Sequence, residues 1–198
     1  MIKTFTGPMH SGKTEHMLDV YLGIYNKECI KVFKPLADTR DFCLMKSKTY
    51  DISVPAIGID RFEEILEYID DKTRTIFLDE VQLMEGDISI LNYLSIVEDM
   101  DVYLGGLNMT SEQEPFLIMP QILAISDKIE NIPASCYDCG REATLTYYDG
   151  QKSDAVKVGD EGYFPLCHRC LVKRRGKDKL RVASNEVIHL LKLKKDEV

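Results

Sequence analysis

The sequence predicts an α/β fold: a parallel sheet with helices on both faces, followed by a smaller cysteine-containing unit. Three observations lead to this expectation. Short apolar runs alternate with helical patterns from residue 2 to residue 105, a glycine-rich segment joins the first run to the first helical pattern, and two Cys-x-x-Cys pairs follow residue 133. With 198 residues and 44% apolar content, the chain can bury a core in one domain plus a small appendage.

The alternation defines the predicted elements in order. We expect strands at residues 2–6, 29–33, 75–78 and 102–105, and helices at residues 14–26, 61–69 and 87–99. Strands that alternate with helices favour a parallel sheet covered on its faces. The polar stretch from residue 35 to residue 60 is too long for an ordinary connection, so we expect a functional loop there.

Residues 7–14, GPMHSGKT, lie between the first predicted strand and the first predicted helix and match the pattern G-x-x-x-x-G-K-[ST]. The pattern is typical of a phosphate-binding loop (P-loop), in which glycines let backbone N–H groups point at phosphate oxygens. A lysine adds a positive charge, and a threonine hydroxyl can ligate Mg²⁺. A ligand-free glycine-rich turn is the competing interpretation, which the strand-to-helix context disfavours. We therefore expect ATP to be bound by Gly7, Pro8, Met9, His10, Ser11, Gly12, Lys13 and Thr14.

A P-loop needs a second partner for magnesium, an aspartate that closes a buried apolar strand. Asp79 follows the apolar run at residues 75–78, and Glu80 comes next. Neighbouring strand residues point to opposite sides of a sheet, so the two carboxylates can have different tasks. We expect Asp79 to hold Mg²⁺ with Thr14, and Glu80 to act as the base that faces the acceptor. The pair alone does not say whether the acceptor is water or a substrate hydroxyl.

Two Cys-x-x-Cys pairs, CYDC and CHRC, indicate a zinc site, because each pair can place two thiolates on one tetrahedral ion. The ligands would be Cys136, Cys139, Cys167 and Cys170. A redox dithiol is conceivable for one pair and improbable for both. We expect a P-loop domain at residues 1–133, a zinc-binding lid domain at 134–183 and a helical tail at 184–198. A lid that excludes water suits a kinase better than an open ATPase.

Charge and targeting signals narrow the class of protein. The formal net charge is -8, which disfavours a protein whose main partner is nucleic acid or an anionic membrane. The chain begins without a basic segment followed by a long apolar run, and no stretch of about 18 apolar residues occurs, so we expect a cytoplasmic protein. The basic run at residues 173–181 is interpreted as a solvated loop that precedes the predicted tail helix.

Several segments together resemble the zinc-containing thymidine kinases of the cytosolic vertebrate and bacterial type. The matching segments, in order, are GPMHSGKT, KPLADTR, IFLDEVQ, the PF of GGLNMTSEQEPF, CYDCGREA and GYFPLCHRC, which cover nearly the whole chain. The resemblance implies transfer of the γ-phosphate of ATP to the 5′-hydroxyl of thymidine, giving ADP and dTMP in pyrimidine salvage. It also implies a homotetramer that is inhibited by the end-product triphosphate.

The resemblance also implies roles for particular residues. Glu80 would be the base, Arg40 would lie near the reacting oxygens, and Gln82 would lie close to both ATP and the sugar. A lid segment would grip the base through its backbone while Tyr163 closes over it. The implied substrate-binding residues are Asp38, Arg40, Gln82, Leu83, Phe116, Val156, Lys157, Val158, Gly159 and Tyr163.

Three departures from the family pattern keep other functions open. Ser111-Glu112 stands where the family usually has a base-stacking Phe followed by a basic or polar residue, His10 replaces a more usual Phe, and KVGDEGY shows no clear second lid glycine. One alternative is a kinase for another or a 5-modified pyrimidine deoxynucleoside. Others are a zinc-ribbon P-loop ATPase that acts on nucleic acid and a nucleotide-binding protein without catalysis, which the intact Lys13 and Glu80 disfavour.

Overall fold

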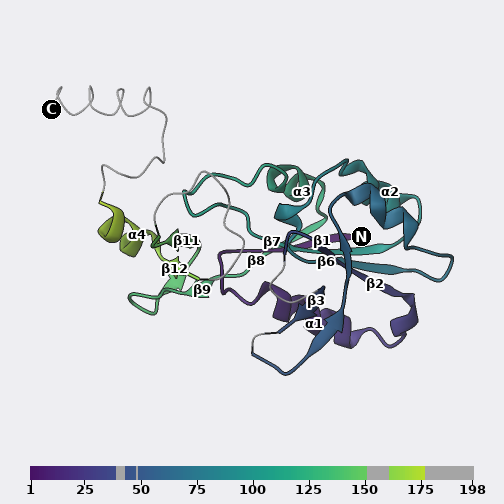
Figure 1. Cartoon of the computed structure of the whole chain (residues 1–198), viewed down its shortest axis with the longest axis horizontal. Coiled ribbons are helices and arrows are strands. Elements are labelled where there is room, and N and C mark those ends of the chain that lie inside the picture. Colours follow the sequence, from purple (N-terminus) through teal and green to yellow (C-terminus); the bar gives the residue numbers. More distant parts are fainter. Residues whose placement is uncertain (39–42, 48, 151–160, 177–198) are drawn as a thin grey trace.

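The computed structural model describes residues 1–38, 43–47, 49–150 and 161–176. Its centre is a six-stranded sheet in the order β5-β2-β6-β7-β1-β8, in which all neighbouring strands are parallel (Figure 1). This confirms the predicted α/β class. The strands are β1 (Ile2–Thr6), β2 (Ile30–Pro35), β5 (Ile57–Ile59), β6 (Thr75–Leu78), β7 (Asp101–Gly106) and β8 (Lys128–Asn131).

Helices cover both faces of the sheet, as expected. Figure 1 shows α1 (Lys13–Gly23) on one face, and α2 (Ser89–Ile96) and α3 (Met119–Ile125) on the other. The helix predicted at residues 61–69 is instead a short 3-10 helix, η2 (Phe62–Glu67). Two further 3-10 helices are η1 (Lys27–Cys29) and η3 (Val81–Leu83).

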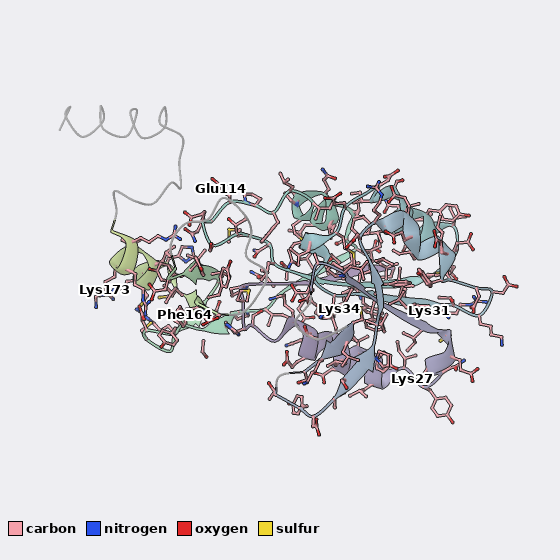
Figure 2. All side chains as sticks on the ribbon, in the orientation of Figure 1. Lys27, Lys31, Lys34, Glu114, Phe164 and Lys173 are labelled. Carbon is pink, nitrogen blue, oxygen red and sulfur yellow. The ribbon has the colours of Figure 1, made fainter. Side chains whose placement is uncertain are left out.

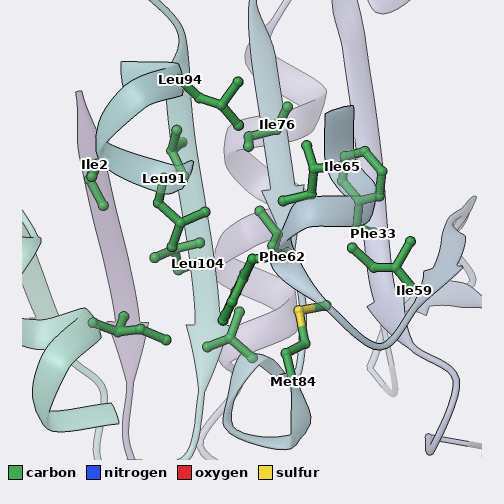
Figure 3. Packing of buried hydrophobic residues seen from close by; sticks show 14 of the residues in the cluster. Ile2, Phe33, Ile59, Phe62, Ile65, Ile76, Met84, Leu91, Leu94 and Leu104 are labelled. Carbon is green, nitrogen blue, oxygen red and sulfur yellow. The ribbon is translucent and has the colours of Figure 1, made fainter. Parts of the chain in front are cut away.

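The core has two layers because strand residues alternate between the faces. In β6, Ile76 and Leu78 join the apolar cluster beneath α2, where Leu91 packs (Figure 3), whereas Phe77 joins the cluster beneath α1 with Met17. All five side chains are fully buried. Each such side chain contributes about 1.5–3 kcal/mol of burial free energy, so the sheet is a rigid base for whatever its strand ends carry.

The segment from residue 35 to residue 60 contains more structure than a loop. Strands β3 (Leu44–Lys46) and β4 (Ser53–Pro55) form an antiparallel pair, and β5 adds a parallel edge strand to the main sheet. Met45 and Val54 bury their side chains in the cluster that α1 covers. The hairpin therefore packs on the helix that follows the P-loop.

The cysteine unit consists of small elements. Its described residues, 134–150 and 161–176, form two antiparallel two-stranded sheets and one helix. The helix corrects the interpretation of the basic run at residues 173–181, since residues 173–175 form its last turn. The tail helix predicted at residues 184–198 lies outside the described residues. The elements are β9 (Ala134–Ser135), β10 (Glu142–Ala143), β11 (Leu145–Tyr148), β12 (Tyr163–Leu166) and α4 (His168–Arg175).

Candidate active site and metal centre

The loop between β1 and α1 has the backbone of a P-loop. Gly12 caps α1 with a φ of 82°, in the left-handed region that favours glycine. Gly7 has a φ of 148°, and a Cβ atom there would lie 2.1 Å from the carbonyl oxygen of Ile132. Both glycines are therefore needed for the conformation and for the close approach of the chain that leaves β8.

Lys13 is buried inside this loop. Its ammonium group donates to the carbonyl oxygen of Pro8 at 2.7 Å and to the Ser11 hydroxyl at 3.3 Å. The positive end of α1 begins at the same point, because Lys13 is the first residue of the helix. A buried ammonium beside a helix N-terminus makes this loop suited to a phosphate.

The two residues predicted to share magnesium are brought together from separate elements. The Thr14 hydroxyl donates to Asp79 at 3.2 Å, and Asp79 is buried at the end of β6. Burial raises the pKa of Asp79 to about 6, the neighbouring charge of Glu80 adds to the rise, and Lys34 opposes it. A hydroxyl next to a carboxylate fits the hard oxygen ligands that Mg²⁺ prefers.

Glu80 reaches the site through a turn rather than through strand alternation. Strand β6 ends at Leu78, and Glu80 has a φ of 56° where it caps η3. Gln82 donates to a carboxylate oxygen of Glu80 at 2.6 Å and accepts a hydrogen bond from the backbone of Leu107 at 3.0 Å. Gln82, predicted to touch nucleotide and substrate, thus fixes the Glu80 carboxylate. The expectation that alternation would separate Asp79 from Glu80 does not apply beyond the strand.

Lys34 is a site residue that the sequence reasoning missed. Its ammonium lies 2.7 Å from Asp38, and both side chains are buried. Burial lowers the pKa of Lys34, but the charge of Asp79 and the contacts with Asp38 and Glu80 outweigh it and raise the pKa above its usual value. Figure 2 shows Lys34 in the middle of the molecule. Lys34 is the first residue of the segment KPLADTR, and this position was the available signal.

Of the residues predicted to contact the substrate, some are placed by the structure. Asp38 lies at the site through Lys34. Leu83 and Phe116 are half-buried, and Phe116 packs against the larger apolar cluster. Arg40, Val156, Lys157, Val158 and Gly159 lie outside the described residues.

The cysteine unit contacts the P-loop directly. The backbone N–H of Met9 donates to the Thr146 hydroxyl at 3.0 Å, and the His10 ring nitrogen lies 3.3 Å from the carbonyl oxygen of Tyr163. The Tyr163 ring packs on Tyr148 with centroids 4.7 Å apart. Tyr163 thus lies beside the phosphate loop, and Thr146 is a second residue that no sequence motif marked.

The four predicted zinc ligands form one cluster. The sulfur atoms of Cys136, Cys139, Cys167 and Cys170 all lie within 4.8 Å of one another. Cys139 and Cys167 are 3.8 Å apart, close to the edge of about 3.8 Å that a tetrahedron with Zn–S bonds of about 2.3 Å would have. The thiols therefore fit a tetrahedral zinc ion.

Arg141 favours the thiolate form of Cys139, whereas burial raises the pKa of the Cys170 thiol to about 12. Arg141 donates to the sulfur of Cys139 at 3.4 Å, and this contact lowers the pKa of the Cys139 thiol to about 6. Metal ions bind the thiolate form, so a nearby guanidinium supports binding. His168 is exposed at the start of α4 and is not a member of the cluster.

Comparisons with known proteins agree with this arrangement. A family model described as thymidine kinase matches residues 1–171. The thymidine kinase of Pseudothermotoga lettingae is 33% identical over 178 residues, which cover 87% of this chain and 95% of that protein. The thymidine kinase of Ureaplasma parvum is 32% identical over 206 aligned positions, which cover 98% of this chain and 92% of that protein. The chain belongs to the thymidine kinase family.

Proposed function

We propose that this protein transfers the γ-phosphate of ATP to the 5′-hydroxyl of thymidine. The observation that carries the proposal is the meeting of Thr14, Asp79 and Glu80 at the mouth of the P-loop, in a chain that belongs to the thymidine kinase family. An ATPase could share the first two residues. A carboxylate fixed by a buried glutamine, beside a second unit that covers the P-loop, favours transfer to a bound hydroxyl over transfer to water.

The chemistry follows from what each side chain can do. Lys13 would turn from the carbonyl of Pro8 toward the β- and γ-phosphates. Thr14 and Asp79 would hold Mg²⁺, which neutralises charge on the phosphate oxygens. Glu80, fixed by Gln82, would orient the 5′-hydroxyl and accept its proton. The transition state of phosphoryl transfer is loose, so positioning and charge are the main requirements.

The nucleoside would lie between the two units. Asp38, held by Lys34, and Arg40 would flank the sugar and the reacting oxygens, while Leu83 and Phe116 would line the base pocket. The lid residues Val156, Lys157, Val158, Gly159 and Tyr163 would close over the base. Tyr163 supports this arrangement because its backbone already lies beside His10 of the P-loop.

We assign the four-cysteine cluster to zinc. Four thiols in a tetrahedral arrangement, with no described histidine among them, are typical of closed structural zinc sites. Such an ion would hold the first turn of α4 against the turn between β9 and β10. Its role would be to stabilise the fold of the cysteine unit, which contacts the P-loop. The zinc ion would take no part in phosphoryl transfer.

The cellular context is proposed from the family and from charge. None of the helices in the described part of the chain is long and apolar enough to cross a membrane. We propose a cytoplasmic homotetramer in which a deoxynucleoside is the small-molecule partner. The net charge of -8 argues against nucleic acid as a partner.

A panel of deoxynucleosides and ribonucleosides, incubated with ATP and Mg²⁺, tests the proposal through the 5′-monophosphate formed. We expect thymidine to be phosphorylated best, with no product when Mg²⁺ is omitted at constant zinc. Lys13→Ala should raise the KM for ATP, because it removes a phosphate contact. ATP hydrolysis without nucleoside monophosphate, or hydrolysis stimulated by DNA, would contradict the proposal.

A further inference from the structure

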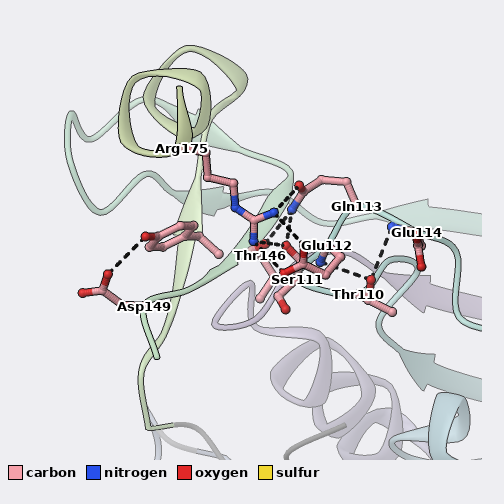
Figure 4. A network of polar contacts seen from close by, with 9 residues as sticks. Thr110, Ser111, Glu112, Gln113, Glu114, Thr146, Asp149 and Arg175 are labelled. Carbon is pink, nitrogen blue, oxygen red and sulfur yellow. Dashed lines mark hydrogen bonds and ion pairs between the residues drawn. The ribbon is translucent and has the colours of Figure 1, made fainter. Parts of the chain in front are cut away.

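The end of α4 is joined to the loop that precedes Phe116 by a cluster of charged contacts (Figure 4). Both terminal nitrogens of Arg175 contact Glu112, at 3.1 Å and 3.0 Å, one on each carboxylate oxygen. One of these nitrogens also donates to the carbonyl oxygen of Ser111 at 2.8 Å. The Arg175 side chain is only 12% exposed, so this is a partly buried, two-pronged ion pair.

The loop that Arg175 contacts is compact. Met109 and Pro115 form an isolated antiparallel bridge, and the backbone N–H of Thr110 donates to the carbonyl oxygen of Glu114 at 2.8 Å. The side-chain amide of Gln113 donates to the carbonyl oxygen of Thr146 in the cysteine unit at 3.2 Å. We call residues 109–115 the β7–α3 loop. Its tip is thus attached to the cysteine unit at two points.

The other end of α4 starts at the metal centre. Cys170 and Leu171 are buried in the first turns of the helix, and Arg175 follows in its last turn. The Arg175 guanidinium lies 5.5 Å from the centre of the Tyr147 ring on β11. The small core around the cysteines and the Tyr147 ring therefore fix the position of Arg175. These contacts do not depend on Glu112.

We infer that Arg175 is a positioning residue that fixes the β7–α3 loop, and through it the affinity for thymidine. This inference rests on the proposed function of the site. The loop contains Ser111, at the position where the family has a base-stacking side chain, and leads directly into Phe116. A planar guanidinium on a carboxylate defines direction as well as distance. A loop that is no longer fixed must be ordered when the substrate binds, and this cost weakens the affinity.

Steady-state kinetics of Arg175→Gln and Glu112→Gln test the inference. We expect each change to raise the KM for thymidine about three- to tenfold, with kcat and the KM for ATP within about twofold of the parent, because the P-loop residues are untouched. The double variant Glu112→Gln/Arg175→Gln should be no worse than Arg175→Gln alone, since one contact is removed twice. Additive losses would show that the two residues act separately.

Arg174→Gln is the matched control. Arg174 is the neighbouring residue, but it pairs with Asp138 inside the cysteine unit, at 2.9 Å. We expect Arg174→Gln to leave the KM for thymidine unchanged. Both arginine variants should retain the metal. Equal effects of the two arginine changes on this KM would overturn the inference, as would a lower melting temperature of Arg175→Gln with an unchanged KM.

Hydrogen exchange separates this inference from the proposed function. Amides of residues 110–114 should exchange faster in Arg175→Gln than in Arg174→Gln, whether or not thymidine is the substrate. A parent protein that does not phosphorylate thymidine would refute the proposed function alone. Unchanged exchange in Arg175→Gln would refute the attachment itself. Glu112→Gln provides the same measurement if Arg175→Gln fails to fold.

Discussion

The two halves of the molecule are held together by different forces. The P-loop domain places a six-stranded sheet between two large apolar clusters. The described residues of the cysteine unit form two two-stranded sheets and one small cluster, in which three of the seven buried members are cysteines of the predicted zinc site. A unit of this size buries too little apolar surface to be stable alone, so we expect it to depend on an ion where the sheet depends on packing.

This difference matches a division of tasks. Lys13, Thr14, Asp79 and Glu80 all lie on the half that is stable through apolar burial, at the ends of buried strands or at the start of a helix. The cysteine unit supplies contacts to the P-loop through Thr146 and Tyr163. We therefore expect that the reacting groups can stay in place while the cover above them is disturbed.

Removal of the metal should have the largest effect, because it should unfold one half of the molecule and leave the other half folded. Ligation of a structural zinc ion supplies on the order of 10 kcal/mol to a small unit, so chelation or Cys170→Ser should unfold residues 134–176. The sheet should remain, because its clusters contain no metal ligand. Far-ultraviolet circular dichroism combined with elemental analysis and hydrogen exchange measures both halves at once.

Cys29→Ser is the control for metal removal. Cys29 lies in η1, and its thiol donates to the backbone carbonyl oxygen of Asn26. We expect one zinc per chain in the parent and in this variant. Complete unfolding of both halves on chelation would show that the two halves are not independent. Full activity after loss of the metal would show that the cysteine unit keeps its fold without an ion.

Glu80→Gln should abolish transfer while both halves stay folded. The amide keeps the shape of the side chain but cannot take the proton of the 5′-hydroxyl, which costs about 10²–10⁴-fold in kcat. ATP binding should survive, because Lys13 and Thr14 are unchanged. Glu85→Gln, an exposed residue two positions after η3, should have normal turnover. Near-normal turnover of Glu80→Gln would remove the base assignment.

Asp79→Asn should stabilise the ligand-free protein at neutral pH while impairing catalysis. The folded pKa of Asp79 is about 6, above the usual value of 3.8, so the folded state binds more protons than the unfolded state between these values. Stability contributed by the protonated form is therefore lost as pH rises through this range. The variant should recover on the order of 1–3 kcal/mol above pH 6, measured by urea unfolding.

Asp70→Asn gives the opposite sign and serves as the control for Asp79. The Thr73 hydroxyl lowers the pKa of the exposed Asp70, so its contribution is present at neutral pH and is lost as pH falls through the lowered pKa. Asp70→Asn should therefore destabilise slightly at neutral pH. A loss of stability in Asp79→Asn at pH 7 would show that its hydrogen bonds with Thr14 and Glu80 outweigh its burial.

Ser111→Phe should have the smallest effect. If position 111 faces the base, a ring there should favour thymidine over bulkier 5-substituted deoxyuridines by about two- to fivefold in kcat/KM. This is less than the ~1–3 kcal/mol that aromatic stacking on a base supplies, because both nucleosides would gain the stacking contact. Ser111→Ala, which adds no ring, should leave the ratio unchanged. An unchanged ratio in Ser111→Phe would mean that another side chain fills the pocket and that position 111 does not face the base.

The sequence predicts the parts that depend on local rules. The P-loop pattern needs glycines at fixed offsets, and the cysteine spacing needs two short turns, so both were found at the correct residues. The major strands were predicted because a buried parallel strand is a continuous apolar run. Strands β3, β4 and β5 were missed because three-residue strands carry too few residues to show a period.

Other site contacts could not be found from sequence, because tertiary packing creates them. The Arg175–Glu112 pair joins residues 63 positions apart, and nothing in a basic run says which arginine will be partly buried. Thr146 and Met9 are 137 positions apart. Helix α3 and edge strand β8 were missed as well. The exposed, charged side chains of β8 are typical of a loop.

The crossing of Gly7 and Ile132 has a mechanical consequence. The backbone N–H of Ile132 donates to the carbonyl oxygen of Thr6 at 2.7 Å, directly before the chain enters the cysteine unit. The start of the P-loop and the segment that leads into the cysteine unit are therefore held together at Thr6, Gly7 and Ile132. We therefore expect a movement of the cysteine unit to begin after residue 132. It would displace Met9 and His10, which contact that unit, more than Gly7. Any larger residue at position 7 would push Ile132 away. It would therefore disturb both the P-loop and the start of the cysteine unit.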